Sequence, residues 1–374
     1  MRALALSPVP YEGAGCRFRI AQYTPYLRSQ RIDLTIAPFY DREFFAMVYQ
    51  RGHYLQKGFH FLRQAAARLA TVVRHGRYDL VMIYREAFPI GPPLIEAALG
   101  AMKVPLVYDF DDAVFLENTS GANRYLAALK YPQKIGAIIR RCDQVIAGND
   151  YLAAYARRFN TSVHVIPTAV DTKVFVPRPE MVPSGRLLVV GWIGTPTTAA
   201  YVAPIADVLV RLARDHVFRF RVSGAGTAVS VPGVDVETPP WSLAREVELF
   251  NTCDIGVYPL PDDDWARGKC GFKAIQFMAC GVPVVASAVG VNREIIQDGV
   301  NGFLASAPAE WHEKLRRLLV DPDLRRRIGA AGRRTIEERY SVEVNAPRVA
   351  DVIRQAAARI GSVVPLAQAS GEPR

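Results

Sequence analysis

The chain has 374 residues and a formal net charge of +10, with 50% hydrophobic and 22% charged residues, a composition typical of globular proteins. Its length exceeds what a single hydrophobic core ordinarily holds, so we expect roughly two domains. No apolar run approaches the roughly 20 residues that cross a bilayer, and no nucleic-acid-binding module is recognisable. These features argue against a membrane-spanning chain and against nucleic acid as a partner.

Cysteine and histidine usage argues against a disulfide framework and against a metal centre. The five cysteines are odd in number, and no pair has zinc or thioredoxin spacing, which predicts a reducing, cytoplasmic compartment. The six histidines form no HExxH or similar cluster. The opening segment MRALALSPVP has a short strand pattern and is too brief for a signal peptide.

The first half of the chain alternates strand and helix patterns, which is typical of parallel α/β sheets. The strand patterns are RALALS (2–7), DLVMIYRE (79–86), PLVYDFDD (105–112), QVIAGN (144–149) and VHVIPT (163–168). Helix patterns lie between them, for example at 60–76 and 126–142. A proline-rich stretch without periodicity, DTKVFVPRPEMVPSG (171–185), then predicts a linker.

The alternation restarts after this stretch and predicts a second domain. Its strand patterns are RLLVVGWIG (186–194), FRFRVSG (218–224), DIGVYPL (254–260) and PVVAS (283–287). We therefore predict two doubly wound, Rossmann-like parallel-sheet domains that face each other across a cleft. The predicted divisions are a first domain (1–172), a linker (173–185), a second domain (186–341), a helix that packs back on the first domain (342–361) and a disordered tail (362–374).

The segment GKCGFKAIQFMACGVPVVAS (268–287) predicts a short helix that leads into a buried strand. Phe272, Ile275 and Ala279 form an apolar stripe, and Gly281 stands where a helix commonly ends. The helix start therefore lies beside Lys269, Gly271 and Lys273. Unpaired N–H groups and cationic side chains suit an anion such as a diphosphate, and a pair of solvated lysines is the alternative interpretation.

Two more helix starts are predicted at carboxyl ends of strands in the second domain. In GWIGTPTTAA, the turn from Gly191 to Gly194 is followed by Thr195 as an N-cap and a proline at the first helical position. In AVGVNREII, Asn292 can cap a helix that carries Glu294. A nicotinamide dinucleotide site is disfavoured because VSGAGTAVS, which contains Gly224, lacks the third glycine and the later acidic residue.

Several of these segments resemble one family. GKCGFKAIQFMACGVPVVASAVGVNREIIQDGVNGFLA is similar to the donor-binding segment of family 4 (group 1) glycosyltransferases. In the first half, YREAFPIGPPLIE, YDFDDAVF, AGNDYLAAYA and VIPTAVDTKVF resemble a bacterial branch of that family with a DFDDA motif. The resemblance implies a two-domain GT-B fold and a retaining sugar transfer from a nucleotide-diphosphate donor. A phosphorylase or a nucleotide-sugar epimerase of the same fold, and a nucleotide-sugar-binding module with a degenerate site, are the alternatives.

The family motif places its ribose-binding glutamate at Gln276 and its first glutamate at Gly268, where no carboxylate stands. The arginine and lysine that usually follow the first strand of the donor domain are also absent, and Lys269, Lys273 and Arg267 are expected to replace their charge. The resemblance implies attack on the face from which the diphosphate leaves, with no metal or other cofactor besides the nucleotide-sugar. The expected donor-binding residues are Gly191, Trp192, Gly194, Thr195, Gly224, Arg267, Gly271, Gln276, Val291, Asn292 and Glu294.

The first domain is expected to hold the acceptor, which can be a glycan, a lipid-linked saccharide or a small metabolite. Carboxylates at the end of a buried strand suggest binding or catalysis, although Asp111 and Asp112 can also cap a helix. Lys269, Lys273, Asp111 and Asp112 are the expected catalytic residues. Gly13, Gly15, Arg17, Arg19, Asp109 and Asn149 are the expected acceptor-side residues, with helix capping as the alternative for Asn149.

The helix pattern at 57–76 has an apolar face together with Lys57, Arg63, Arg68 and Arg74. Such a helix can dock on anionic lipid, which leaves open a peripheral contact with the inner face of the cytoplasmic membrane. The alternative is an ordinary surface helix whose apolar face meets its own sheet.

Overall fold

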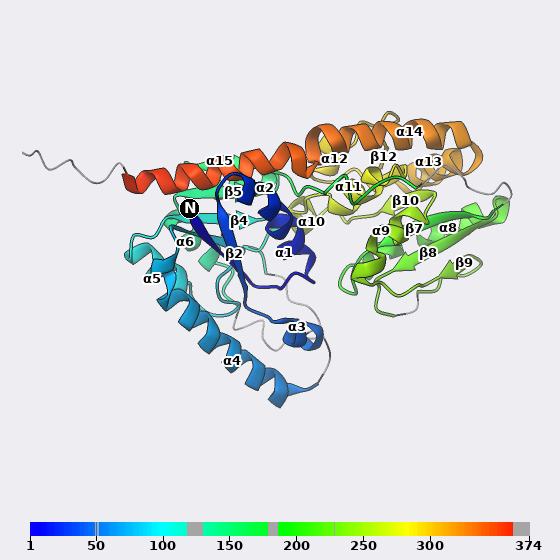
Figure 1. Cartoon of the computed structure of the whole chain (residues 1–374). Helices are drawn as coiled ribbons and strands as arrows, with labels where there is room; N and C mark the ends of the chain where they lie inside the picture. The colour runs from blue at the N-terminus through cyan, green and yellow to red at the C-terminus, as the bar shows by residue number, and fades with distance from the viewer. Residues whose placement is uncertain (49, 51, 118–129, 179–185, 228, 362–374) are drawn as a thin grey trace, which may run out of the picture.

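In the computed structural model, residues 1–48, 50, 52–117, 130–178, 186–227 and 229–361 are described. They form two six-stranded parallel sheets with helices on both faces, which confirms the predicted fold class (Figure 1). The predicted tail (362–374) and parts of the predicted linker (179–185) and of the helix pattern at 126–142 (126–129) lie outside the described residues.

The first sheet has the strand order β2-β1-β3-β4-β5-β6. Its strands are β1 (Arg2–Ser7), β2 (Asp33–Pro38), β3 (Leu80–Tyr84), β4 (Leu106–Phe110), β5 (Gln144–Ala147) and β6 (Val163–Val165). The helices of this half are α1 (Ala14–Arg19), α2 (Thr24–Ser29), α3 (Arg42–Val48), α4 (Tyr54–Val73), α5 (Leu94–Ala101), α6 (Lys134–Arg141) and α7 (Asp150–Arg157), with 3-10 turns η1 (Ala21–Tyr23) and η2 (His75–Arg77). Strands β3 and β4 are buried on both faces, as their continuous apolar runs predict.

The second sheet has the strand order β12-β11-β10-β7-β8-β9. Its strands are β7 (Leu188–Ile193), β8 (Phe218–Ser223), β9 (Asp235–Glu237), β10 (Ile255–Tyr258), β11 (Val284–Ser287) and β12 (Phe303–Ala305). Its helices are η4 (Ala199–Val202), α8 (Ala203–Asp215), η5 (Leu243–Arg245), α9 (Glu246–Asn251), α10 (Asp264–Arg267), α11 (Phe272–Ala279), α12 (Asn292–Ile295), α13 (Pro308–Val320) and α14 (Pro322–Thr335), followed by a π-helical turn η6 (Ile336–Tyr340).

The last helix, α15 (Val342–Gly361), returns to the first sheet and runs along it (Figure 1). Its buried residues Val349, Ala350 and Ile353 join the core formed by β1, β3 and the segment from Ile20 to Ile32. Residues from both ends of the chain therefore build one core on this face of the first sheet.

The short helix α11 begins and ends where the sequence predicts. It spans Phe272–Ala279, and Gly281 follows with a φ of +67°, which is the left-handed geometry of a glycine that ends a helix. Its own N-cap, Gly271, also has a positive φ of +64°. Gly271 therefore precedes the first residue of this eight-residue helix, and Gly281 follows its C-cap, Cys280.

Two of the predicted helix starts are wrong. Thr195 is followed by a hydroxyl-bonded turn, in which Thr198 Oγ1 accepts from the Thr195 N–H at 3.0 Å, and α8 begins only at Ala203. Asn292 is the first residue inside the four-residue helix α12 instead of its cap, and its Nδ2 donates to the Ser287 carbonyl at 2.9 Å. The alternative interpretation of Asp111 or Asp112 as a helix cap is also wrong, because no helix follows them in the described residues up to Glu117.

Candidate active site

A pocket lies where residues that follow the strands of the two sheets meet, with a volume of about 370 Å³. The first sheet contributes Asn149 and Tyr151, which follow β5. The second sheet contributes two segments that follow β10 and β11, and their lining residues are Asp262, Arg267, Ala288–Val291, Arg293 and Glu294. Ligands of open α/β sheets bind at this edge, so the pocket is the strongest candidate for a substrate site.

The loop 267–271 of the second domain docks directly on the first domain. Asn149 caps α7 through the Leu152 N–H and also donates from Nδ2 to the carbonyls of Gly268 at 3.2 Å and Lys269 at 3.0 Å. Cys270 donates from Sγ to the carbonyl of Asp111 at 3.1 Å. The capping role of Asn149 is thereby confirmed, and the same side chain holds the two domains together.

Gly268 occupies the position of the family's first glutamate, and it has no room for a side chain. A Cβ atom at this position would lie 2.6 Å from the Ala113 Cβ and 3.1 Å from its backbone nitrogen. Ala113 belongs to the segment DFDDA at the end of β4. The absence of a side chain at Gly268 therefore allows the two domains to approach each other closely at this point.

The carboxylates after β4 form an ion cluster that spans the cleft. Asp111 accepts from the Tyr84 hydroxyl at 2.7 Å and from the Arg85 guanidinium at 2.7 and 2.9 Å. Asp112 also pairs with Arg85, and Lys269 of the second domain lies 3.8 Å from Asp112 Oδ1. The structure thus brings together three of the four predicted catalytic residues, Asp111, Asp112 and Lys269.

Electrostatics keep Asp111 ionised. Burial alone would raise the pKa of this carboxyl, but the charges of Arg85 and Arg19 and the bonds from Tyr84 and Arg85 outweigh it, so the pKa is lowered. Arg85 has a φ of +59°, which is rare for a residue with a side chain. Such strain is common where a functional site fixes a side chain in place.

Arg19 and Asp109 pair with each other instead of facing the cleft, which corrects their assignment to the acceptor side. Arg19 donates from Nε and Nη2 to Asp109 at 2.9 and 2.7 Å, and both side chains are 1% exposed. Arg19 also donates to the Ile166 carbonyl at 2.9 Å. This buried pair therefore ties α1 to the sheet and has no surface to offer a substrate.

A second polar chain links the domains around the predicted ribose position. Lys273 donates from Nζ to Gln276 Oε1 at 2.6 Å, and Gln276 Nε2 approaches Glu246 Oε1 at 3.4 Å. Glu246, on α9, accepts from Arg17 of the first domain at 2.8 Å, and this ion pair is almost fully buried. Gln276 itself is fully buried. Arg17, predicted on the acceptor side, thus reaches into the donor domain.

Lys273 is a perturbed base. Burial, reinforced by the nearby charge of Arg17 and opposed by that of Glu246, lowers the pKa of its amino group from 10.5 to about 8. Its ammonium also lies over the rings of Phe250 and Phe272, at 5.3 and 5.5 Å from their centroids.

The predicted glycines on the acceptor side make space for other groups. A Cβ on Gly15 would lie 2.2 Å from the Tyr84 hydroxyl, and one on Gly13 would lie 2.8 Å from the Val9 side chain. Gly15 therefore allows α1 to approach the Tyr84 side chain that bonds to Asp111.

The first strand of the second sheet contributes less to the site than predicted. Trp192 is buried in the core against β8, and Gly191 lies against the Cys253 side chain. Gly194 and Gly224 lie against each other, because a Cβ on Gly224 would be 2.2 Å from the Gly194 carbonyl oxygen. Thr195, by contrast, is exposed at the turn that follows β7.

The start of α11 adjoins the wall of the pocket. A Cβ on Gly271 would contact Ile295 at 2.3 Å, Asn292 Oδ1 at 3.1 Å and Val291 at 3.2 Å. Glu294 lines the pocket, and burial together with the charge of Asp150 raises the pKa of its carboxyl. Arg267, which also lines it, pairs with Asp262 at 2.9 Å and Asp264 at 3.3 Å.

Five side chains of this region are not among the residues predicted from the sequence: Tyr84, Arg85, Tyr151, Arg293 and Glu246. Tyr84 is the last residue of β3, the strand next to β4 in the sheet, and Arg85 follows it, so a search of all carboxyl ends of strands would have found both. Arg293 stands beside the predicted Asn292 and Glu294. Glu246 has no local signal, because its partners are distant in the sequence.

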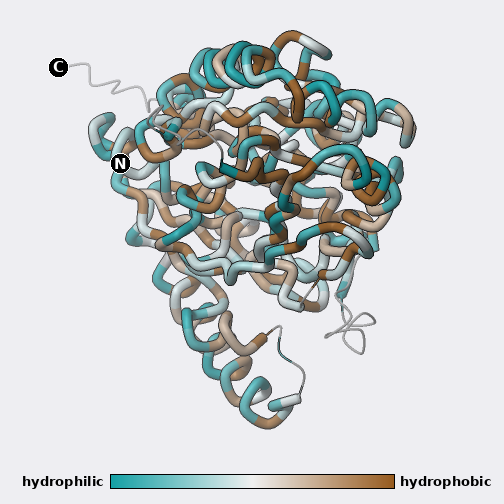
Figure 2. Tube along the Cα trace, turned by 90° about the vertical axis from the view of Figure 1, so that its right-hand side faces the viewer, coloured by the Kyte–Doolittle hydropathy of each residue, from teal (hydrophilic) through white to brown (hydrophobic). Residues whose placement is uncertain are grey.

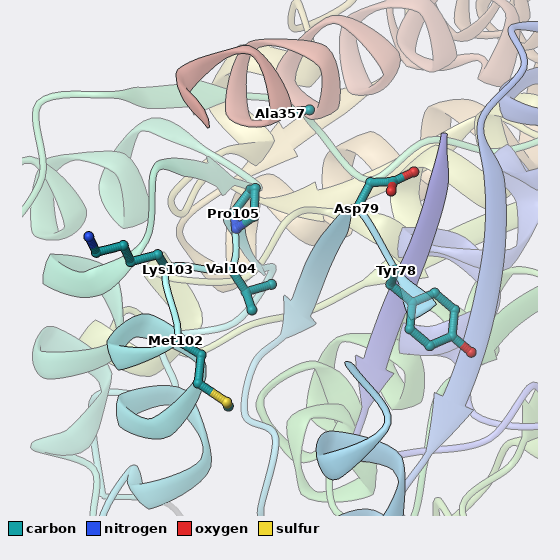
Figure 3. Close-up of a pocket in the computed structure, with 7 residues that line it drawn as sticks. All are labelled: Tyr78, Asp79, Met102, Lys103, Val104, Pro105 and Ala357. Atoms are coloured by element: carbon teal, nitrogen blue, oxygen red, sulfur yellow. The ribbon is translucent and has the colours of Figure 1, made fainter. Parts of the chain in front are cut away.

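A second pocket, of about 380 Å³, lies at the other end of the first sheet, where β3 and β4 begin. Figure 3 shows the side chains of Tyr78 and Lys103 pointing in opposite directions, so its polar groups do not converge. Its lining residues are Tyr78, Asp79, Met102, Lys103, Val104, Pro105 and Ala357. The pocket between the sheets is therefore the better candidate.

Within the described ranges, no cluster of three or more His, Cys, Asp or Glu side chains is arranged to hold a metal ion. Among the same residues, no helix has the length and apolar character needed to cross a membrane.

Comparisons with curated proteins return sugar-transferring enzymes. A D-inositol 3-phosphate glycosyltransferase from Xylanimonas cellulosilytica is 27% identical over 294 residues, which cover 68% of this chain and 67% of that protein. One of the same name from Thermobispora bispora is 30% identical over 130 residues, which cover 34% of this chain and 29% of that protein. The matched region thus spans between about a third and two thirds of the length of these relatives.

Solved structures share the fold of this chain. Sucrose-phosphate synthase from Thermosynechococcus elongatus superposes with a TM-score of 0.66 at 17% identity and covers 96% of this chain and 99% of that one. HepE from Anabaena, solved with UDP-glucose, has a TM-score of 0.66 at 18% identity and covers 97% of this chain and 100% of that one.

Two sequence models of families match the two halves of the chain. The model described as Glycosyltransferase Family 4 matches residues 19–174, and the model described as Glycosyl transferases group 1 matches residues 186–321. The matches correspond to the two sheets that enclose the pocket, and together they cover most of the chain. The chain therefore belongs to the family 4, group 1 glycosyltransferases and is a transferase of the two-domain GT-B fold.

Proposed function

We infer that this enzyme moves a sugar from a nucleotide-diphosphate donor to a hydroxyl group of an acceptor, with retention at the anomeric carbon. The observation that carries the proposal is the pocket between the two sheets, which is lined by residues of both family-matched halves. The UDP and UDP-glucose named in the HepE structures support a nucleotide-sugar donor. The inositol phosphate named for the curated relatives supports a hydroxylated acceptor.

The donor domain supplies the charges for the departing diphosphate. Lys269 and Lys273 flank the N-terminus of α11, where backbone N–H groups point outward without a side-chain cap. Arg267 and Arg293 add two cationic side chains at the pocket. Because negative charge grows on the diphosphate as the glycosidic bond breaks, these preorganised groups stabilise the transition state. The proposal therefore requires no metal ion or other cofactor.

Gln276 takes the ribose position as a neutral hydrogen-bonding partner. It is fully buried and bonded to Lys273, and Glu246 separates it from Arg17 of the first domain. Donor binding therefore involves rearrangement of the Arg17–Glu246 pair, so that the ribose hydroxyls reach the amide. In the structure this pair is a contact between the two domains.

On the first domain, Asp112 is the carboxylate that orients the acceptor hydroxyl. Asp111 accepts from Tyr84 and Arg85 and its side chain is 14% exposed, whereas the side chain of Asp112, which also pairs with Arg85, is 22% exposed. No protein nucleophile is invoked, so the acceptor attacks the face from which the diphosphate departs. A diphosphate oxygen accepts the acceptor's proton as the new glycosidic bond forms, which balances the reaction.

The test begins with a thermal-shift screen of the whole chain against UDP-, GDP-, ADP- and TDP-sugars. A true donor at about 100 times its dissociation constant should add about 3 kcal/mol to the free energy of unfolding. Donor hydrolysis and transfer to added polyols and saccharides are then followed by NMR, and the product should keep the anomeric configuration of the donor. Stabilisation without hydrolysis or transfer, or an inverted product, would overturn the proposal.

A further inference from the structure

Helix α4 exposes its apolar side to solvent. The side chains of this stripe and their exposed fractions are Leu55 (92%), Phe59 (66%), Leu62 (70%), Leu69 (55%) and Val73 (79%). Their spacing of four, three, seven and four residues places them on one side of the helix. We call them the α4 stripe. Figure 2 shows this helix projecting from the body of the molecule, with apolar segments along it.

The opposite side of α4 carries buried polar groups. Lys57, His60 and Arg68 are each less than 9% exposed. Arg68 donates to the carbonyl of Ser7 at 2.9 Å, and Lys57 donates to the carbonyl of Gln50. Lys57 and Arg68 therefore do not face a bilayer, which corrects their predicted role. The alternative of an apolar face that meets its own sheet is also wrong for the α4 stripe.

This orientation is the reverse of that of an ordinary surface helix, which turns its apolar side inward. A contiguous apolar patch of a few hundred Å² is about the largest that a soluble monomer commonly leaves in water, and larger ones mark interaction surfaces. The buried polar contacts fix the helix in this orientation, so the stripe does not turn inward without losing them.

The charge around the stripe selects the partner. From Phe44 to Tyr78 the sequence holds six Lys or Arg residues and no Asp or Glu. Arg74 and Arg77, at the end of the helix, are exposed, and neither side chain forms an ion pair with any other described residue. Arg63, on the flank of the stripe, is paired with Asp41 and lies near Glu43. The surroundings of the stripe are thus cationic at one end and nearly neutral at the other.

The helix also borders the edge of the first sheet that faces the pocket. Phe61 packs against Phe39 and Phe88, which follow the carboxyl ends of β2 and β3. The Ser7 carbonyl bound by Arg68 belongs to the end of β1. A surface that contacts the α4 stripe would therefore lie alongside the acceptor side of the molecule.

We propose that the α4 stripe docks the protein on the surface of an anionic lipid bilayer. The five apolar side chains enter the boundary between headgroups and acyl chains, and Arg74 and Arg77 contact the anionic headgroups. This assignment depends on α4 and on the turn that follows it, and on no residue of the pocket, so it stands or falls independently of the transfer reaction.

The experiment is co-sedimentation of the full chain with vesicles of phosphatidylcholine alone and of phosphatidylcholine with about 30% phosphatidylglycerol, whose surface is anionic. The wild type should sediment with the anionic vesicles at low salt and much less with the neutral ones. The double variant Phe59→Ser/Leu62→Gln should lower the partition coefficient at least about tenfold, because two apolar contacts with the acyl region are lost. Its matched control is Val217→Gln/Val320→Gln, which changes two exposed apolar residues of the second domain and should bind like the wild type.

The charge contribution is tested by Arg74→Glu/Arg77→Glu against Arg327→Glu/Arg334→Glu, which changes net charge equally on exposed positions of α14. Only the first pair should reduce binding, by about tenfold or more, since each basic residue near the surface contributes a factor of about five. Equal binding by the stripe variant and the wild type would overturn the proposal. A dimer of the wild type in light scattering that dissociates in the stripe variant, without vesicle binding, would assign the stripe to a second copy of the chain instead.

Discussion

Replacing Lys273 with methionine should uncouple activity from stability. The pKa of this amino group falls from 10.5 to about 8, which corresponds to about 3 kcal/mol of unfavourable free energy for holding the charged form in the fold. Methionine has a similar shape and removes the charge, but it also leaves Gln276 Oε1 without its 2.6 Å bond, at a cost of about 1 kcal/mol. We therefore expect Lys273→Met to raise the free energy of unfolding at pH 7 by about 1–2 kcal/mol. Turnover should fall about a hundredfold, because a cation beside the developing anion is lost.

The same pKa shift determines how the stability of the protein changes with pH. The folded protein binds this proton more weakly than the unfolded chain, so the penalty is fully present below pH 8 and stability rises between about pH 8 and 10.5. Wild-type turnover should decline as pH rises through about 8, when Lys273 loses its charge. Lys273→Arg stays cationic throughout this range, so its turnover should lack that decline even if its maximum is lower.

The measurements are steady-state donor hydrolysis and urea unfolding of the wild type and both variants between pH 6 and 10. Near-wild-type turnover in Lys273→Met would show that the diphosphate lies elsewhere. A loss of stability in that variant of more than about 2 kcal/mol would show that the ammonium supports the fold, which would refute the argument from its pKa.

Three further predictions concern other parts of the site. Gly268→Glu restores the family's carboxylate but places side-chain atoms against Ala113. Turnover should therefore fall at least about tenfold, and small-angle scattering should show a larger radius of gyration. A gain in turnover would contradict the close approach of the domains. Arg19→Met should lower the free energy of unfolding by about 3–5 kcal/mol because it leaves the Asp109 charge buried, whereas Arg19→Met/Asp109→Leu should recover most of that loss in urea unfolding. If the double variant is no more stable than Arg19→Met, the unpaired charge of Asp109 is not the cause of the destabilisation. Excess EDTA should leave donor hydrolysis unchanged, and a loss that Mg²⁺ or Mn²⁺ restores would contradict metal-independent transfer.

Local sequence signals predicted the elements whose ends are encoded within a few residues. Helix α11 is one case, because an apolar stripe and Gly281 mark it without reference to the rest of the fold. The strands that were missed, β2, β9 and β12, all lie at an edge of their sheet. Three-residue strands such as β9 and β12 carry little pattern of their own, and pairing with a longer neighbour determines them.

Residues of the candidate site were predicted where their own segment carries a signal. They were missed where their role depends on a partner that is distant in the sequence. Asp112 and Lys269 were both named from their own segments, and the structure brings them together. The Arg17–Glu246 pair joins residues 229 positions apart, and nothing near Glu246 indicates its partner. The predicted helix start at Thr195 is wrong for another reason. The hydroxyls of Thr195 and Thr198 close a turn that competes with helix formation.

The return of α15 to the first sheet constrains how the protein is made. The core that contains Ile20, Tyr23 and Leu27 is completed by Val349, Ala350 and Ile353, which leave the ribosome long after the strands they cover. At about 5–20 residues per second, the interval between synthesis of β6 and of α15 is roughly 10–35 s. During that time the face of the first sheet that α15 covers is only partly covered, by the segment from Ile20 to Ile32, while the second domain is already able to fold. Chaperones that shield nascent apolar surfaces would therefore be needed mainly by the half of the protein that is synthesised first.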